Sequence, residues 1–111
     1  MPSAIYQLFR SAIAAEQQVV CNYQGHRREV CPHIIGTNKD GAEVVLAWQF
    51  GGTSSQGKLP PGGQWRCLLL RNVTHATARD GDWRSGGDHR TTQTCVAHID
   101  IDVNVHIRRA R

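Results

Sequence analysis

The chain has 111 residues and a net charge of +4, from 13 basic and 9 acidic side chains. This length fits a single domain over residues 1–111, and 40% hydrophobic with 20% charged residues is the composition of a globular protein, not a disordered one. No run approaches the ~18 consecutive apolar residues of a membrane helix, and no signal-peptide pattern opens the chain. We therefore expect one cytoplasmic domain without a membrane partner, too short for a large enzyme with its own cofactor domain.

Arginine supplies 11 of the 13 basic side chains, and Lys39 and Lys58 supply the others. Arginine makes bidentate contacts with phosphate and stacks on bases, so the bias favours an anionic partner. A codon usage rich in arginine produces the same bias, and composition does not separate the two explanations.

Apolar residues recur at helical spacing near the start of the chain, at Ile5, Leu8, Phe9, Ala12 and Ile13. Serine is a preferred residue before the first turn of a helix, and Ser3 stands at that place. The pattern predicts an amphipathic helix over residues 3–16.

The next part of the chain predicts strands. Segments rich in β-branched and aromatic residues predict barrel strands between residues 18 and 78. These strands are expected at residues 18–23, 28–36, 43–50 and 64–73, and the last one is expected to continue to residue 78 after a bend. Turns are predicted at residues 24–27 and 38–41, and Pro32 predicts a bulge or an edge. The glycine-rich segments 51–63 and 79–94 are predicted to be loops.

Residues 98–107 alternate strictly between polar and apolar, which predicts a long, half-exposed C-terminal strand over residues 95–107. The polar face carries Asp100 and Asp102, which we interpret as a solvated strand face and not as a catalytic pair. One helix followed by about five strands predicts a mainly β (α+β) fold, either a small barrel or a strongly bent sheet with the helix packed against it.

The four cysteines contain no CxxC pair and are expected to be reduced. If the first hairpin is centred on His26, Cys21 and Cys31 lie opposite each other, with His33 further along the same face. These side chains could bind zinc, with Cys67 as a fourth ligand, and a cross-strand disulfide is the alternative. Isolated cysteines in strands are more often small core residues, so neither a metal nor a cofactor is expected.

The order of residues over about 4–73 resembles a WYL domain. The matching features are a helix, a strand ending in Tyr23, a basic turn with Arg27 and Arg28, Pro32-His33, Leu46, and Arg71 ahead of Val73, while Val44-Val45 replaces the name-giving Trp-Tyr pair. The resemblance implies an Sm-like or SH3-like β-barrel. It also implies a regulatory role, because WYL domains are ligand-sensing parts of bacterial transcription factors and of some defence systems, with nucleotides or nucleic acids held in a basic groove.

Six residues are the candidates for that groove: Tyr23, Arg27, Arg28, His33, Arg66 and Arg71. Arginine provides charge and N–H donors for phosphate, and Tyr23 or Trp65 provides a flat partner for a base. Neighbours on a strand point to opposite faces, so at most one of Arg27 and Arg28 faces the groove, and parity with His33 favours Arg27. The alternative is that Tyr23 packs in the core and the arginines form a solvated surface.

We therefore expect a binding module, not an enzyme, because no nucleophile–base set, P-loop or GxGxxG motif is present. The expected ligand is a nucleotide or single-stranded DNA or RNA, and the expected role is in transcription or defence, as a homodimer or beside a separate DNA-binding partner protein. The alternative is a structural module that oligomerises through its C-terminal strand without a small ligand.

Overall fold

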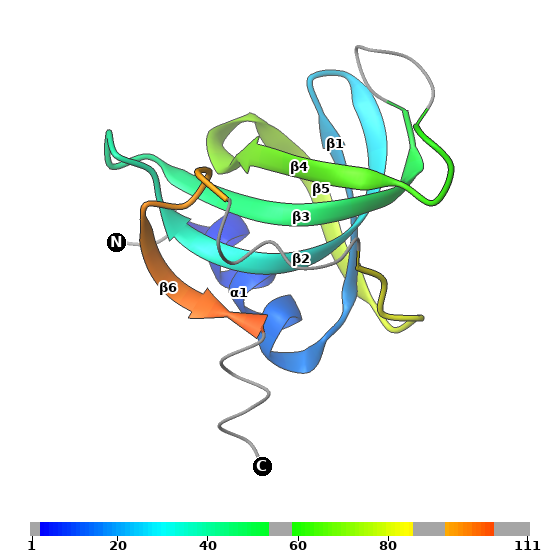
Figure 1. Cartoon of the computed structure of the whole chain (residues 1–111), viewed down its shortest axis with the longest axis horizontal. Helices are drawn as coiled ribbons and strands as arrows, with labels where there is room; N and C mark the ends of the chain where they lie inside the picture. Colours follow the sequence, from blue (N-terminus) through cyan, green and yellow to red (C-terminus); the bar gives the residue numbers. More distant parts are fainter. Residues whose placement is uncertain (1–2, 54–58, 86–92, 104–111) are drawn as a thin grey trace.

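The computed structural model describes residues 3–53, 59–85 and 93–103. In these residues the chain forms α1 (Ala4–Ala15), β1 (Gln18–Tyr23), β2 (His26–Thr37), β3 (Glu43–Gly52), β4 (Gln64–Leu69), a 3₁₀ helix (Leu70–Asn72), β5 (Val73–Arg79) and β6 (His98–Asp102). The predicted mainly β fold with an N-terminal helix is therefore confirmed. Figure 1 shows a strongly curved sheet with α1 behind β2 and β3.

The helix α1 begins and ends as its sequence predicts. The Ser3 hydroxyl accepts a hydrogen bond from the Tyr6 N–H at 3.1 Å, and Glu16 closes the helix in the left-handed conformation, with φ 52°. Phe9, Ala12 and Ile13 are fully buried against the sheet. No helix in the described residues is long and apolar enough to cross a lipid bilayer.

The strands form one antiparallel sheet in the order β4-β3-β2-β1-β5, and β6 pairs with β2. One edge of β2 pairs with β3, while its other edge pairs first with β1 and then with β6. In the described residues the outer strands β4 and β5 do not pair, so the sheet is not closed into a barrel. The end strand β4 nevertheless approaches β1, the neighbour of the other end strand, and the Leu69 N–H in β4 donates to the Tyr23 hydroxyl in β1 at 3.1 Å.

The turn between β1 and β2 is tighter than predicted. Gln24 and Gly25 both have positive φ, 53° and 81°, as a two-residue turn of a twisted hairpin requires. Tyr23 therefore pairs with His26, and Cys21 pairs with Arg28. The prediction that Cys21 and Cys31 lie opposite each other was wrong, because it placed the centre of the hairpin on His26.

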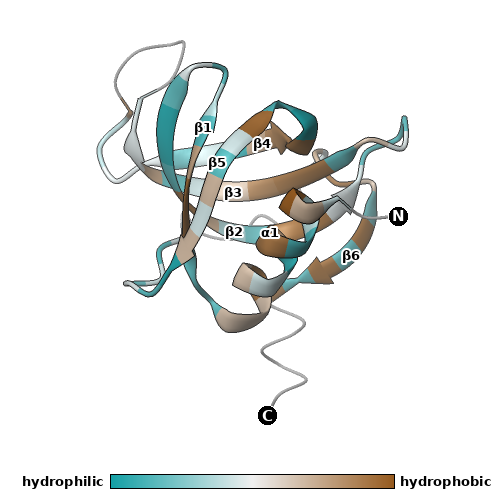
Figure 2. Ribbon diagram, turned by 180° about the vertical axis from the view of Figure 1, so that it is seen from behind, coloured by the Kyte–Doolittle hydropathy of each residue, from teal (hydrophilic) through white to brown (hydrophobic). Residues whose placement is uncertain are grey.

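Apolar residues fill both faces of the curved sheet. The main core lies between α1 and the concave face, where Val19, Val30, Ile35 and Val45 are fully buried. Figure 2, which views the molecule from behind, shows α1 lying across this face. A second, smaller cluster contains Ile34, Val44, Leu46 and Val96. The register shift in β2 between Pro32 and Ile34 confirms the bulge predicted there.

The C-terminal strand is shorter than predicted. β6 covers His98–Asp102, and residues 104–107 of the predicted strand lie outside the described residues. A register shift in the pairing with β2 breaks the alternation, so Ile99 is 51% exposed. Asp100 does not simply face solvent as expected, because its carboxylate accepts from the Tyr6 hydroxyl at 2.5 Å and from Arg10 Nε at 3.0 Å.

Candidate functional site

Two arginines from different strands meet at one amide oxygen inside the curved sheet. Arg28 of β2 and Arg66 of β4 each donate to Gln49 Oε1 at 3.3 Å. The Gln49 side chain is fully buried, and its Nε2 donates to the carbonyl oxygens of Gly51 and Thr53 at 3.0 and 3.2 Å. Because these two bonds hold the amide nitrogen, the amide oxygen is directed at the arginines.

The strand register places both arginines on the concave face. Cys21, a core residue, is the partner of Arg28 across β1 and β2. Ala47, another core residue, is the partner of Arg66 across β3 and β4. Residues paired directly across an antiparallel sheet share a face, so both guanidinium groups extend from the polar end of the main core. We call Arg28 and Arg66 the arginine pair.

Tyr23 forms the aromatic side of this site. The guanidinium carbon of Arg28 lies 5.0 Å from the centre of the Tyr23 ring, a cation–π contact. The hydroxyl of the same tyrosine accepts from the Leu69 N–H. Tyr23 is 7% exposed and belongs to the main core. Arg28 therefore packs against the face of the Tyr23 ring, and β4 holds its hydroxyl group.

The arginine pair carries positive charge that the described residues do not neutralise. Arg28 is 3% exposed, and burial, followed by the charge of Arg66, lowers the pKa of Arg28 below its ordinary value. In the described part of the chain the ion pairs involve Arg10, Arg27 and Arg79. There, Arg28 Nε is buried with no hydrogen-bond partner. Since buried charges in proteins are normally paired, this site has the chemistry to take an anion.

The other three predicted site residues lie elsewhere. Arg27, which parity favoured, is exposed and donates to Glu29 at 3.1 Å, whereas Arg28 is buried. The Nδ1 of His33, a buried residue, donates to the Cys31 carbonyl at 2.7 Å. Arg71 is exposed on the 3₁₀ helix. The structure thus brings together three of the six predicted residues, Tyr23, Arg28 and Arg66.

The His33 ring belongs to a row of aromatic side chains. It lies 4.9 Å from the Trp65 ring, edge to face, and 4.8 Å from the Trp83 ring. Trp65 in turn lies 5.1 Å from Trp48. Trp65 and Arg66 are adjacent in a strand, so they point to opposite faces. Trp65 therefore does not lie beside the arginine pair, whereas Tyr23 does.

Sequence reasoning missed the two glutamines of the site. Gln49 interrupts the apolar run of β3, and a polar residue within an expected core strand was the signal that could have found it. Gln64 lies next to Arg66, and with its amide oxygen turned toward the guanidinium it accepts from Arg66 Nε at 2.9 Å. Both residues present neutral amides, so they hold the arginines without neutralising them.

The structure has a disulfide between Cys67 and Cys95, with 5.6 Å between the Cα atoms, so the expectation of four reduced cysteines was wrong. Cys21 and Cys31 are free and buried. No CxxC spacing marks the bonded pair, because the fold joins residues 28 positions apart. In the parts of the chain that the structure describes, no three His, Cys, Asp or Glu side chains gather as metal ligands would.

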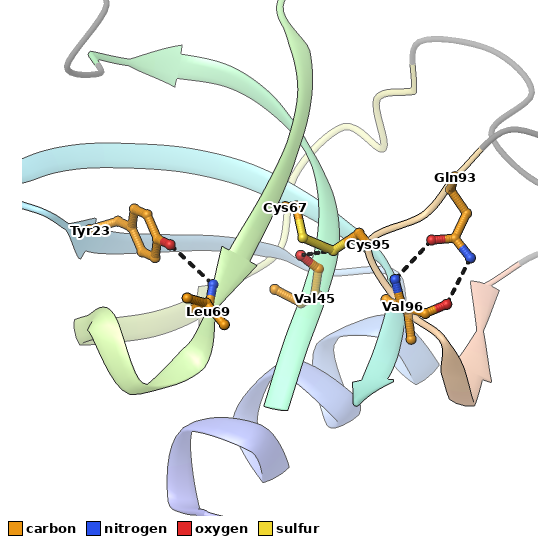
Figure 3. Close-up of a disulfide and its surroundings, with 7 residues drawn as sticks. All are labelled: Tyr23, Val45, Cys67, Leu69, Gln93, Cys95 and Val96. Atoms are coloured by element: carbon orange, nitrogen blue, oxygen red, sulfur yellow. Dashed lines mark hydrogen bonds between the residues drawn. A yellow bond between two sulfur atoms is a disulfide. The ribbon is translucent and has the colours of Figure 1, made fainter. Parts of the chain in front are cut away.

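The disulfide borders an open cleft of about 940 Å³. Apolar side chains of β3 and β4, chiefly Leu46, Trp65 and Leu69, line it, together with Tyr23 and residues from the segment 93–97. Figure 3 shows the disulfide between β4 and this segment, with Tyr23 bonded to Leu69. Tyr23 is thus shared by the cleft and the site of the arginine pair.

Comparison with protein-family models, with curated proteins and with solved structures finds no match for this chain.

Proposed function

We propose that the protein is a regulatory binding module for a nucleotide or a single-stranded nucleic acid, whose phosphate is held by the arginine pair beside Tyr23. The observation that carries this proposal is the buried Arg28 guanidinium, next to Arg66 and without a carboxylate bonded to it in the described residues. A phosphate would supply the missing negative charge and accept several N–H bonds at once.

The neighbouring groups fit a rigid phosphate site. Gln49 holds both arginines from one oxygen atom, so little side-chain freedom is lost when an anion binds. Tyr23 provides the aromatic surface at this site, already oriented by Arg28 and Leu69. These groups bind and orient a ligand, and the role that we propose is recognition without catalysis, cofactor or metal.

The resemblance to WYL domains supplies the finer parts of the proposal. They are an Sm-like or SH3-like barrel, a role in bacterial transcription or defence, a cytoplasmic location and a separate DNA-binding partner. The approach of β4 to β1 through Leu69 and Tyr23 supports a barrel-like arrangement, since β4 is one end of the paired sheet and β1 lies next to the other end, β5.

The test is fluorescence anisotropy of labelled single-stranded DNA and RNA over a salt series, with unlabelled nucleotides as competitors. Arg66→Gln should weaken binding and reduce the slope of log affinity against log salt by about one unit for each phosphate that the variant no longer neutralises. Arg84→Gln is the matched control, because it removes the same charge from an exposed residue. Equal affinities and slopes for the two variants would contradict the proposal.

Arg71→Gln examines a residue that the resemblance implies but that the geometry separates from the arginine pair. If Arg71, exposed on the 3₁₀ helix, contacts a longer nucleic acid, its removal should weaken binding of oligonucleotides and leave a mononucleotide unaffected. If the site takes only a mononucleotide phosphate, Arg71→Gln should behave like Arg84→Gln.

One observation favours the alternative role as an interaction module. β6 pairs with β2 alone among the described strands, and Ile99 on it is the exposed large hydrophobic residue there. An open strand edge with an apolar side chain can pair with a second chain. Light scattering should then show a dimer that Ile99→Lys dissociates. Val103, which follows β6 directly, is 1% exposed, so a charge there would disrupt the core instead.

A further inference from the structure

We propose that the Cys67–Cys95 disulfide is a site of thiol–disulfide exchange, opened by an external dithiol, and that its opening changes the shape of the cleft beside it. This inference concerns the cleft and the segment 93–97, and it does not depend on the proposed function of the arginine pair. It rests on the exposure of the two sulfur atoms, the contacts that hold the segment, and the position of Trp65.

The bonded cysteines are accessible, and the free cysteines are not. Cys67 is exposed, Cys95 is half-buried, and both line the cleft. The free cysteines, Cys21 and Cys31, are 1% and 0% exposed. Burial raises the pKa of both thiols, that of Cys21 to about 11, so they stay protonated and unreactive near neutral pH. An external thiol therefore meets only the disulfide in the folded protein.

The disulfide links the segment 93–97 to Cys67 of β4, while other contacts hold the end of that segment against the sheet. The Ala97 N–H donates to the Thr37 carbonyl at 3.0 Å, and Val96 is buried in the second apolar cluster. Among the described residues, the Gln93 side chain bonds within the segment, to the N–H and the carbonyl of Val96, each at 3.0 Å. Opening the disulfide thus frees residues 93–95 from β4 and leaves Val96 and Ala97 in place.

The exchange proceeds in two balanced steps. A thiolate of the dithiol attacks Cys67 Sγ, the more exposed sulfur, to form a mixed disulfide, and Cys95 leaves as a thiolate that takes a proton. The second thiol of the reductant, as its thiolate, then attacks the mixed disulfide, which yields the Cys67 thiol and the oxidised, cyclic reductant. Cys95 Sγ lies 3.7 Å from the Val45 carbonyl oxygen, so the Cys95 thiol has an acceptor as soon as it forms.

The exposed position of the bond and the cytoplasmic location that we propose both favour a regulatory bond over a structural one. Disulfides of cytosolic proteins are usually transient or redox-sensing, and exposed ones are reduced more readily than buried ones. Trp65 lines the same cleft from β4, and it contacts His33 and Trp48. A change in the shape of the cleft should therefore alter the surroundings, and so the fluorescence, of Trp65.

The test treats the native, oxidised protein with a dithiol, alkylates the thiols, and locates the labels by peptide mass spectrometry. We expect two labels on the folded chain, at Cys67 and Cys95, and labelling about 100-fold slower at Cys21 and Cys31, which react only after local unfolding. The far-UV circular dichroism should stay unchanged while the tryptophan emission changes. Trp65→Phe should remove most of that change.

The double substitution Cys67→Ser/Cys95→Ser is the control for the reduced state. Its tryptophan emission should match that of the reduced protein and should not respond to the dithiol. If Cys67 and Cys95 are labelled only at denaturant concentrations that also expose Cys21 and Cys31, the bond is structural and the proposal is wrong. Complete reduction with unchanged emission would also overturn it. The labelling result needs no variant, so a failure of the double variant to fold leaves the test intact.

Discussion

Replacing Arg28 with methionine should stabilise the free protein while it removes anion binding. The substitution loses the cation–π interaction with Tyr23, worth ~0.5–2 kcal/mol, and the bond to Gln49, worth about 1 kcal/mol. It also removes a 3% exposed charge and its repulsion of Arg66. Apolar replacement of buried ionic groups is often neutral or stabilising, by ~1–4 kcal/mol. Because that range is a net effect, which already includes the loss of such contacts, we expect a gain of about 1–2 kcal/mol in the free energy of unfolding.

Urea unfolding followed by circular dichroism measures this change, at constant ionic strength with and without tripolyphosphate. At 100 times its dissociation constant the anion should add about 2.7 kcal/mol to the wild type and nothing to Arg28→Met. Arg84→Met, an exposed arginine changed in the same way, is the control. A loss of more than about 2 kcal/mol in anion-free Arg28→Met would refute the reasoning, because it would show that the guanidinium stabilises the fold by itself.

Three further outcomes follow from single contacts. The hydrogen bond from the Tyr6 hydroxyl lowers the pKa of Asp100 in the folded protein, so the ionised carboxylate stabilises the fold above its unfolded pKa, and this stability is lost as the pH falls. Urea unfolding measured at a series of pH values below 5 should therefore show a smaller loss of stability for Asp100→Asn than for the wild type. Gln24→Asn should raise the stability by about 0.5 kcal/mol in thermal melts, because Asn adopts positive φ more readily. Gly36→Ala places a Cβ against the His98 carbonyl, so hydrogen exchange should show β6 amides losing protection.

The local part of the fold was predictable because it depends on residues close in sequence. The spacing of Ile5, Phe9 and Ile13 determined the helix, and its observed span, Ala4–Ala15, differs from the prediction by one residue at each end. Runs of β-branched residues located the first four strands, and Pro32 located a bulge. The last strand was overestimated, because alternation alone does not show where pairing with β2 ends.

The site depends on pairing register, which the sequence does not specify. An odd shift in register, such as the three residues between the predicted and the observed pairing of this hairpin, reverses the faces of a strand. The actual turn at Gln24 and Gly25 therefore makes Arg28, and not Arg27, the inward residue. The Cys67–Cys95 pair was unpredictable for a similar reason, because the proximity of these residues results from the packing of distant segments.

Stability alone does not account for the residues at the polar end of the core. An aliphatic residue in place of Arg28 would complete the cluster around Val19 and Val30 and would relieve the repulsion from Arg66. The structure instead uses a fully buried glutamine to hold two cations at one point. Unfavourable arrangements of this kind persist where a ligand supplies the compensating group, as an anion would here. The stability that Arg28→Met is expected to gain and the stability that a bound anion adds to the wild type therefore have the same cause, the relief of an unpaired buried charge.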